Sequence, residues 1–319
     1  MKLRKLYETV VAKGIDADPR GREAVLKSLE KKKKAYGEMK EEDREFFDTE
    51  SLTNPYADTR ILYGTGEEEI ETVLVGIDME MGEILLADRL SQKGRKIDLV
   101  IAHHPEGKAY ANFYEVMHMQ ADILKKFGVP INIAEDLLEG RIKEVRRRLA
   151  PVNHTRASDM ARLLDIPFMC MHTPADNMVA GHLQKTLDEK APDTLGDILK
   201  ILKEIPEYRE AAKNNAGPHI LLGSEGRSAG RIFVDMTGGT EGAKDIFESI
   251  ANSGINTIVA MHLSEDHREK AEKHHVNVVI AGHISSDNLG INLMLDELQE
   301  KGGLEVIACS GFRRFSRKK

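Results

Sequence analysis

Residues Thr72–His104, TVLVGIDMEMGEILLADRLSQKGRKIDLVIAHH, give the clearest indication of the fold. This stretch holds an apolar run, a turn with glycine, an amphipathic segment, another glycine and a second apolar run that ends in histidine. Residues 231–262, RIFVDMTGGTEGAKDIFESIANSGINTIVAMH, repeat this order with the same spacing between the first run and the terminal histidine. The pattern predicts two βαβ units, and hence an α/β fold with mainly parallel sheets. The similarity fits an internal duplication, and it equally fits the common order of elements in such folds.

Length and composition predict two lobes preceded by a helical segment. The chain has 319 residues, of which 41% are hydrophobic and 31% charged, which is enough to bury a sizeable core. Near the N-terminus Val25, Leu26 and Leu29 recur at helical spacing in a stretch rich in Lys and Glu, so we expect helices packed outside the core. The expected division is a helical N-terminal extension at 1–56, a first α/β lobe at 57–185 and a second α/β lobe at 186–319.

Composition disfavours several classes of protein. The formal net charge of -7 argues against a nucleic-acid groove, because phosphate binding leaves a basic footprint. No segment approaches the ~20 apolar residues of a membrane span, and the first residues lack the apolar core of a signal peptide, so we expect a cytoplasmic protein with no membrane partner. Only Cys170 and Cys309 are present, which argues against a disulfide framework or a cysteine-based zinc site.

Two adjacent histidines, His103 and His104, end an apolar run and are followed by Pro105. Neighbouring side chains in a strand point to opposite faces, and proline cannot donate to a sheet ladder. We therefore expect the pair at the carboxyl end of a strand, where the chain leaves the sheet. Side chains that diverge there can bind different metal ions.

Two further apolar runs end in histidine with an aspartate four residues later: His172 with Asp176, and His283 with Asp287. Taken alone, Asp287 is better explained as an acid that offsets a helix dipole than as a metal ligand. Three such strand ends together supply imidazole and carboxylate groups, the ligands of Zn, Fe, Mn or Ni. Five or six ligands are too many for one catalytic ion with an open position, so the sequence predicts two divalent metal ions.

These motifs together resemble the NIF-three-like family of the YbgI type, a family also described as GTP cyclohydrolase I type 2-like. The resemblance covers nearly everything after the N-terminal extension. It is carried by HHP at His103–Pro105, HTPAD at His172–Asp176, TGG at Thr237–Gly239, LSE at Leu263–Glu265, and AGH ending at His283 with Asp287 four residues on.

The resemblance implies a toroidal homohexamer of two-lobed chains, with a dinuclear metal centre between the lobes. The family usually has Glu where this chain has Asp287, whose side chain is one methylene shorter, so bridging geometry and metal preference stay open. The N-terminal extension also departs from the family and leaves the packing of the ring open. The metal ligands that the resemblance implies are His103, His104, Asp176, His283 and Asp287.

Further residues are expected in supporting roles. His172 is expected to hold a ligand by hydrogen bonding, and His262 to line the cavity next to the ligands. Glu265 is the candidate general base. Gly238 and Gly239 are candidates to bind an anion through backbone N–H groups at a helix start.

Two functions fit such a site. The first is a metal-dependent hydrolase that acts on a nucleotide, a phosphoester or a purine-like ring. The second is a carrier or scaffold that holds iron or another metal without turnover. A hydrolase should also have substrate-binding groups facing the cavity, whereas a carrier needs only an exchangeable site. The candidates for such groups are Arg227, Arg231, Arg313 and Arg314.

Overall fold

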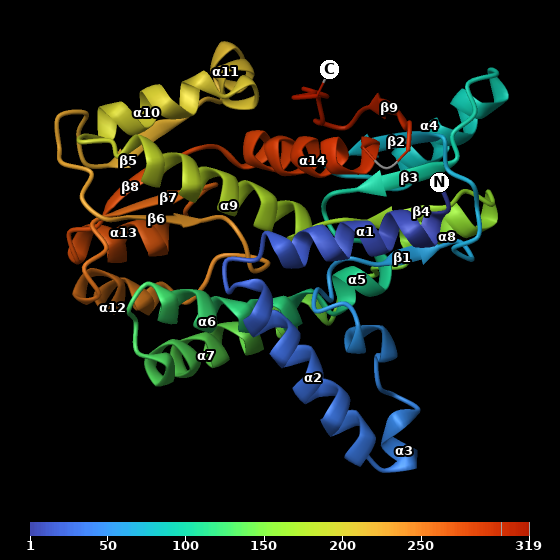
Figure 1. Cartoon of the computed structure of the whole chain (residues 1–319), viewed down its shortest axis with the longest axis horizontal. Helices are drawn as coiled ribbons and strands as arrows, with labels where there is room; N and C mark the ends of the chain where they lie inside the picture. The colour runs from blue at the N-terminus through green and yellow to red at the C-terminus, as the bar shows by residue number, and fades with distance from the viewer. Residues whose placement is uncertain (301, 319) are drawn as a thin grey trace.

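Two mainly parallel sheets form the framework of the chain (Figure 1). In the computed structural model, which describes residues 1–300 and 302–318, the sheet orders are β1-β4-β3-β2-β9 and β5-β8-β7-β6. Within these residues only the edge strands β1 and β5 run antiparallel to their neighbours, so the predicted α/β fold with two lobes is confirmed. The strands are β1 (Ile61–Tyr63), β2 (Thr72–Gly76), β3 (Leu99–Ala102), β4 (Phe168–Cys170), β5 (His219–Leu222), β6 (Ile232–Asp235), β7 (Thr257–Ala260), β8 (Asn277–Ile280) and β9 (Glu305–Ala308).

The two similar passages form parallel strand pairs. The first gives β2, helix α4 (Met81–Gln92) and β3. The second gives β6 and β7, but its helical part is only η3 (Lys244–Ile246) followed by α12 (Phe247–Asn252). The strands β3 and β7 are buried along their whole length, as uninterrupted apolar runs in a covered parallel sheet should be.

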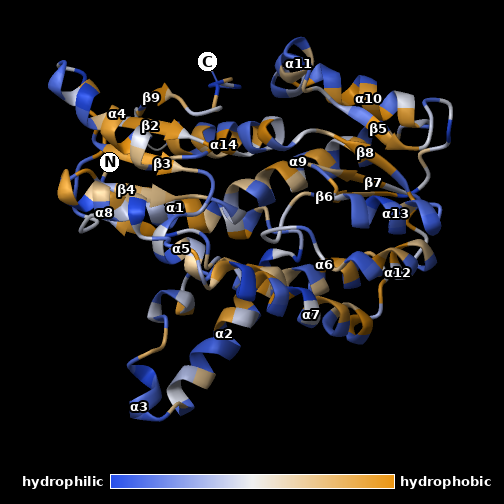
Figure 2. Cartoon of the chain, turned by 180° about the vertical axis from the view of Figure 1, so that it is seen from behind, coloured by the Kyte–Doolittle hydropathy of each residue, from blue (hydrophilic) through white to orange (hydrophobic). Residues whose placement is uncertain are grey.

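Helices cover both faces of each sheet and create four apolar cores. In the first lobe α1 and α14 cover one face, and α4 and α8 the other. In the second lobe α6, α7, α12 and α13 cover one face, and α9, α10 and α11 the other, so hydrophobic colour concentrates on the strands (Figure 2). The remaining helices are α1 (Leu3–Asp16), α2 (Arg22–Glu38), α3 (Glu41–Arg44), η1 (Thr49–Leu52), α5 (Gly107–Ala111), η2 (Phe113–His118), α6 (Met119–Lys126), α7 (Ile131–Leu149), α8 (Arg156–Leu163), α9 (Thr173–Lys190), α10 (Leu195–Glu204), α11 (Pro206–Lys213), α13 (Glu265–Lys273) and α14 (His283–Gln299).

The first helix differs from the expected outer extension. Leu3 and Leu6 of α1 are fully buried in the core of the first lobe. Helices α2 and α3 do project from the body, as Figure 1 shows, and Val25 and Leu29 are the buried residues of α2. We call residues 22–47 the arm. Residues 1–16 therefore belong to the core, and only the arm lies outside it.

The end of the chain returns to the first lobe. Strand β9 pairs in parallel with β2, with Val306 opposite Val73. The expected boundaries differ here from the structure, because residues 186–319 contribute to both lobes and position 185 lies within α9. A four-residue strand carries no sequence signal for the sheet that it joins.

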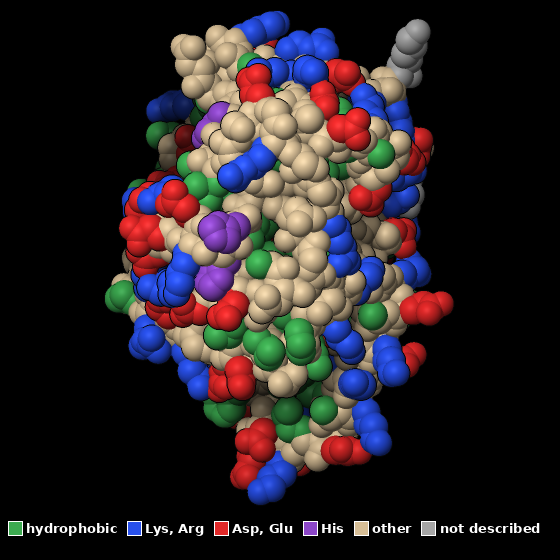
Figure 3. Space-filling model, turned by 90° about the vertical axis from the view of Figure 1, so that its left-hand side faces the viewer, with side chains coloured by type: hydrophobic (Ala, Val, Ile, Leu, Met, Phe, Trp, Pro, Cys, Tyr) green, Lys and Arg blue, Asp and Glu red, His purple; other side chains and the backbone are tan. Residues whose placement is uncertain are grey.

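The surface of the second lobe mixes charges of both signs. On the end formed by α10, α12 and α13, Figure 3 shows Lys and Arg interspersed with Asp and Glu, and the described side chains form no continuous basic area on this face. Nucleic acids bind to continuous basic surfaces.

In the part of the chain that the structure describes, no helix combines the length and apolarity needed to cross a membrane.

Helices α9 and α14 lie side by side and contribute residues to the cores of both lobes (Figure 1). Their backbones approach closely at Gly290, where an added Cβ would overlap the carbonyl oxygen of Ala175 and stand 2.9 Å from its carbonyl carbon. Only glycine permits this approach. Asp176 and Asp287 lie on either side of this contact, one on each helix.

We predict that Gly290→Ala lowers the free energy of unfolding by about 1–3 kcal/mol, because the methyl group overpacks the contact between the two helices. Urea denaturation measures this change. Gly140→Ala is the matched control, since Gly140 lies inside α7 with open space around its Cα, and it should stabilise the protein by up to ~1 kcal/mol. Equal effects of the two variants would contradict the close contact.

Candidate metal centre

Six imidazole and carboxylate side chains meet where the two lobes join. They come from the ends of β3 and β4 and from the starts of α9 and α14. Their ligand atoms lie within 4.8 Å of one another in three overlapping groups. We call the six residues the metal cluster; it contains all five ligands implied by the resemblance, and also His172. The groups are His103, His104 and His172; His104, His283 and Asp287; and His103, Asp176 and Asp287.

The adjacent histidines are oriented by different acceptors. The backbone N–H groups of His103 and His104 donate to the carbonyls of Gly76 and Ile77, so the chain follows β2 for two residues beyond β3. His103 Nδ1 lies 3.2 Å from the carbonyl oxygen of Met171, and His104 Nδ1 lies 2.6 Å from Asp78 Oδ1. With Nδ1–H donating in each ring, Nε2 keeps its lone pair for a metal ion.

Asp287 presents its two oxygens to different imidazoles. Its Oδ1 lies 3.4 Å from His103 Nε2, and its Oδ2 lies 3.5 Å from His104 Nε2 and 3.6 Å from His283 Nε2. These separations are too long for good hydrogen bonds. They match the spacing of about 3.4 Å between two ligand atoms that each lie about 2.1 Å from one tetrahedral ion.

Several buried polar atoms of the cluster have no hydrogen-bond partner among the described residues. They are His103 Nε2, Asp176 Oδ1 and both carboxylate oxygens of Asp287. A buried polar atom without a partner is costly, and such atoms are rare in native structures. Cations placed between these atoms would satisfy all four, so the residues present fit metal ions.

The charges of the cluster favour the same conclusion. Burial lowers the pKa of His103, but the negative charges of Asp287 and Asp176 outweigh burial and raise this pKa overall. Burial raises the pKa of Asp287, but the neighbouring histidines, His103 first, outweigh burial and lower it. The cluster therefore attracts positive charge, which a metal ion supplies in place of protons.

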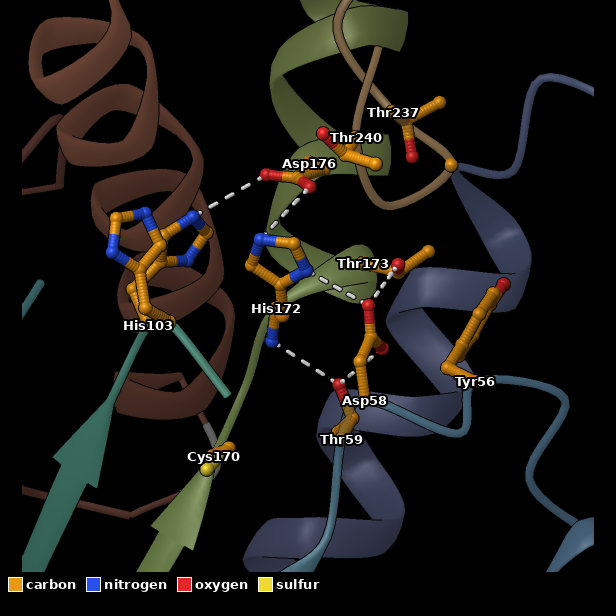
Figure 4. A network of polar contacts seen from close by, with 12 residues as sticks. Tyr56, Asp58, Thr59, His103, Cys170, His172, Thr173, Asp176, Thr237 and Thr240 are labelled. Carbon is orange, nitrogen blue, oxygen red and sulfur yellow. Dashed lines mark hydrogen bonds and ion pairs between the residues drawn. The ribbon is translucent and has the colours of Figure 1, made fainter. Parts of the chain in front are cut away.

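His172 is positioned more like a ligand than expected. Figure 4 shows its ring between Asp58 and Asp176, with Nδ1 2.8 Å from Asp58 Oδ2 and Nε2 3.7 Å from Asp176 Oδ2. Thr173 Oγ1 donates to the same Asp58 oxygen at 2.6 Å, which fixes the carboxylate. His172 thus faces the cluster, and Asp58 fixes the orientation of the His172 ring through the contact at Nδ1. Asp58 lies in a turn before β1 with no motif around it, so the sequence gives no signal for it.

The position of Asp287 on its helix excludes the simpler explanation of this acid. Helix α14 begins at His283, and no acidic residue lies in its first turn. Asp287 is therefore not placed to offset the helix dipole, which acts within that turn. Its full burial also requires a partner that a helix start does not supply.

A second acid–histidine pair lies next to the cluster. The rings of His262 and His283 are 4.9 Å apart between centroids, and His262 Nδ1 lies 3.3 Å from Glu241 Oε1. Sequence reasoning missed Glu241, which follows the TGG motif. The structure does not bring the expected general base, Glu265, to this site: its side chain is exposed and pairs with Arg268.

The glycines of the TGG motif have a structural role. Gly238 and Gly239 both have positive φ, and an added Cβ at Gly238 would stand 2.7 Å from Gln120 Cγ. Gln120 Nε2 donates to the carbonyls of Gly238 and Thr240 at 2.7 and 2.8 Å. The loop is thus folded against α6 and does not begin a helix, unlike the expected anion site; the next element, η3, starts only at Lys244.

Two cavities reach the metal cluster. The larger has a volume of about 600 Å³ and extends into the second lobe. The smaller has a volume of about 440 Å³ and is bounded mainly by the first lobe. The cluster therefore lies between two spaces that a small molecule can enter. Asp176 and Asp287 line the larger cavity, His104 and His283 the smaller, and His172 and His262 both.

Comparison with solved structures identifies proteins with the same architecture. A crystal structure described as a NIF3 superfamily protein from Sphaerobacter thermophilus is 29% identical, with a TM-score of 0.68, over 80% of this chain and 92% of that chain. Reduced HcgD from Methanocaldococcus jannaschii shares the fold at 16% identity, with a TM-score of 0.50, over 84% of this chain and 94% of that chain. No family model matches the chain, and no curated sequence is similar to it.

The fold and the site define a two-lobed α/β protein with a histidine and aspartate cluster between its lobes. Such a cluster is suited to binding metal ions. Together with the likeness to the Sphaerobacter protein, these features support the family that the motifs indicate, the NIF3 superfamily.

We predict that Asp58→Asn weakens metal binding by about 10–100-fold, because His172 loses the carboxylate that fixes its ring and tautomer. Titration of the metal against a chelator measures the affinity. Asp159→Asn, at an exposed carboxylate of α8, is the control and should leave the affinity unchanged. Unchanged affinity in Asp58→Asn would show that His172 contributes nothing to metal binding.

Proposed function

We propose that the chain is a dinuclear metal-dependent hydrolase. The observation that carries this proposal is the placement of Asp287 between two ligand groups. Its Oδ1 is directed to the group with His103 and Asp176, and its Oδ2 to the group with His104 and His283. A carboxylate that faces two groups in this way is suited to bridge two cations.

The residues of the cluster leave room for chemistry. Two divalent cations held by the cluster would lower the pKa of water toward ~7 and would stabilise negative charge on a substrate. Each ligand group supplies three ligand atoms, counting one atom from each residue, and His172 lies beside His103 and His104. Fixed imidazoles hold their lone pairs toward the centre, and the buried Asp287 neutralises part of the added charge. The arrangement leaves positions for water and substrate on the sides that face the cavities.

His262 is the residue that we propose to move a proton in this reaction, in place of Glu265. Glu241 fixes its ring through Nδ1, and Glu241 is itself fixed by a hydrogen bond from the backbone N–H of Ser264. Nε2 of His262 is then free to donate to a leaving group, as in other carboxylate–histidine pairs. Its position along both cavities supports this role.

A metal carrier remains the second candidate function, and one observation favours it. The side chains of His283 and His104 are 40% and 27% exposed, whereas those of His103 and Asp287 are 1% exposed. One ligand group therefore opens to solvent through the smaller cavity. A carrier would exchange its metal on that side, and the ion would be cargo.

We predict that the protein, purified without a metal-binding tag and reconstituted, holds two equivalents of Fe, Zn, Mn or Ni per chain. Asp287→Asn should reduce this toward one equivalent or none, since two cations that close repel each other without a shared anion. Elemental mass spectrometry measures the content, with Asp266→Asn at an exposed acid as the control. One equivalent or fewer in the wild type would exclude the dinuclear site.

The same preparations separate the two functions. A hydrolase should release product from members of a panel of phosphoesters, nucleotides and aromatic amidines. Its activity should fall together with the metal content in Asp287→Asn. If two metals are bound and transferred to an acceptor chelator without turnover of any panel member, the carrier replaces the hydrolase.

We further propose that the chain forms a ring of six copies, as the resemblance implies. The arm supports a role in assembly, because Phe46, which follows α3 in the arm, is 84% exposed and offers apolar area that another copy can cover. The arm also projects from the body, where another copy can reach it (Figure 1).

Light scattering should therefore give about six times the mass of one chain at micromolar concentration, and Phe46→Ser should shift the distribution toward smaller species because it removes exposed apolar area. Leu163→Ser, at another exposed apolar residue on α8, is the control and should shift it less. Metal content should be equal in all three proteins. A monomeric wild type would reject the ring.

A further inference from the structure

The larger cavity has the size and walls of a small-molecule site. Its volume of about 600 Å³ lies within the range of ~300–1,000 Å³ typical of such sites. Phe127, Phe233 and Phe247 line it, from the end of α6, from β6 and from α12. Aromatic walls of this kind suit a flat apolar body. The opposite end of the cavity reaches Asp176 and Asp287 of the metal cluster.

The charge of the cavity is strongly acidic. Seven carboxylates line it against two lysines, and no arginine lies among its described lining residues. Two of the carboxylates belong to the metal cluster, and the other five still outnumber the lysines. The arginines expected at the site serve elsewhere: Arg313 pairs with Glu210, and Arg314 with Asp296. Phosphate or carboxylate groups on the body of a ligand would meet repulsion here.

Asp235, the last residue of β6, differs from the other acids of this cavity. It has no hydrogen-bond or ion-pair partner for its side chain among the described residues. By contrast, Asp18 pairs with Arg20, and Glu241 accepts from Ser264. The Asp235 side chain is exposed to the cavity, and the surrounding protein and then the negative charge of Glu241 raise its pKa to about 6. At neutral pH it is mostly ionised and unpaired.

We propose that the larger cavity binds a flat aromatic or heteroaromatic molecule that carries a cationic or N–H-rich nitrogen group, and that Asp235 pairs with this group. The proposal names the substrate class of the hydrolase and so rests on the proposed function. An amidine-type edge offers two parallel N–H donors, which match the two oxygens of one carboxylate. The apolar body then lies against the aromatic walls, with its far end toward the metal cluster.

Three probes with one ring system test this proposal by isothermal titration: naphthamidine as a cation, naphthamide as a neutral N–H donor and naphthoate as an anion. On the metal-loaded wild type, naphthamidine should bind about tenfold more tightly than naphthamide, and naphthoate most weakly, as expected for a charged hydrogen bond in a partly desolvated site. This ranking needs no variant. Naphthoate binding as tightly as naphthamidine overturns the proposal.

Two variants locate the interaction. Asp235→Asn should lower the affinity for naphthamidine about tenfold and leave that for naphthamide within about twofold. Glu189→Gln removes the same charge from an exposed acid that also lines the cavity, and should change either affinity by less than about twofold. Equal naphthamidine affinity in Asp235→Asn and the wild type overturns the pairing. Binding is measured without turnover, so this failure is distinct from a failure to hold two metals or to hydrolyse a substrate.

Discussion

Asp176 and Asp287 are both buried, and each has an oxygen 3.4 Å from the same nitrogen, His103 Nε2. Two carboxylates this close repel each other strongly in a low-dielectric interior. They lie near the starts of different helices, α9 and α14, so their repulsion acts directly on the packing at the junction of the lobes. The fold therefore requires positive charge between the two carboxylates, as the proposed metal-dependent reaction does. Metal binding and the arrangement of the lobes are coupled for this reason.

The packing of helices α9 and α14 couples the metal cluster to both lobes. Each contributes to the apolar cores of both lobes, so the packing of both lobes bears on the positions of the ligands. Gly290 lets the backbones approach within contact of Ala175, which brings the two helix starts together. Strand β9 follows α14 in the chain and pairs with β2, which joins this part of the chain to the first sheet. These contacts at the junction of the lobes explain why His103 and Asp287 have a spacing suited to one ion. The two residues are 184 positions apart in sequence.

The sequence predicted those parts of the site that local patterns encode. Strand ends marked by histidine are visible because an apolar run, a histidine and a later acid lie close together in the chain. Asp58 and Glu241 were not predictable, because each lies in a loop and acts through a contact that only the tertiary structure creates. Glu265 was chosen for its motif, but a residue at the exposed start of α13 pairs with the next helical turn instead. The sheet to which β9 belongs was not predicted for a similar reason. A four-residue strand carries no information about a partner strand that lies far away in the sequence.

The two ligand groups differ in how firmly the protein holds them. In the group of His103, Asp176 and Asp287 all three side chains are buried, and His103 is fixed at Nδ1 by a backbone carbonyl. In the group of His104, His283 and Asp287, His104 is fixed at Nδ1 by Asp78. His283 is partly exposed and has no hydrogen-bond partner among the described residues, apart from its proximity to Asp287. Binding to fixed groups loses less side-chain freedom than binding to a mobile one, so the group around His103 is the stronger binding position. The weaker position faces the smaller cavity, where ligands and ions enter. If two ions bind as proposed, this asymmetry would favour exchange of ligands at the more exposed position.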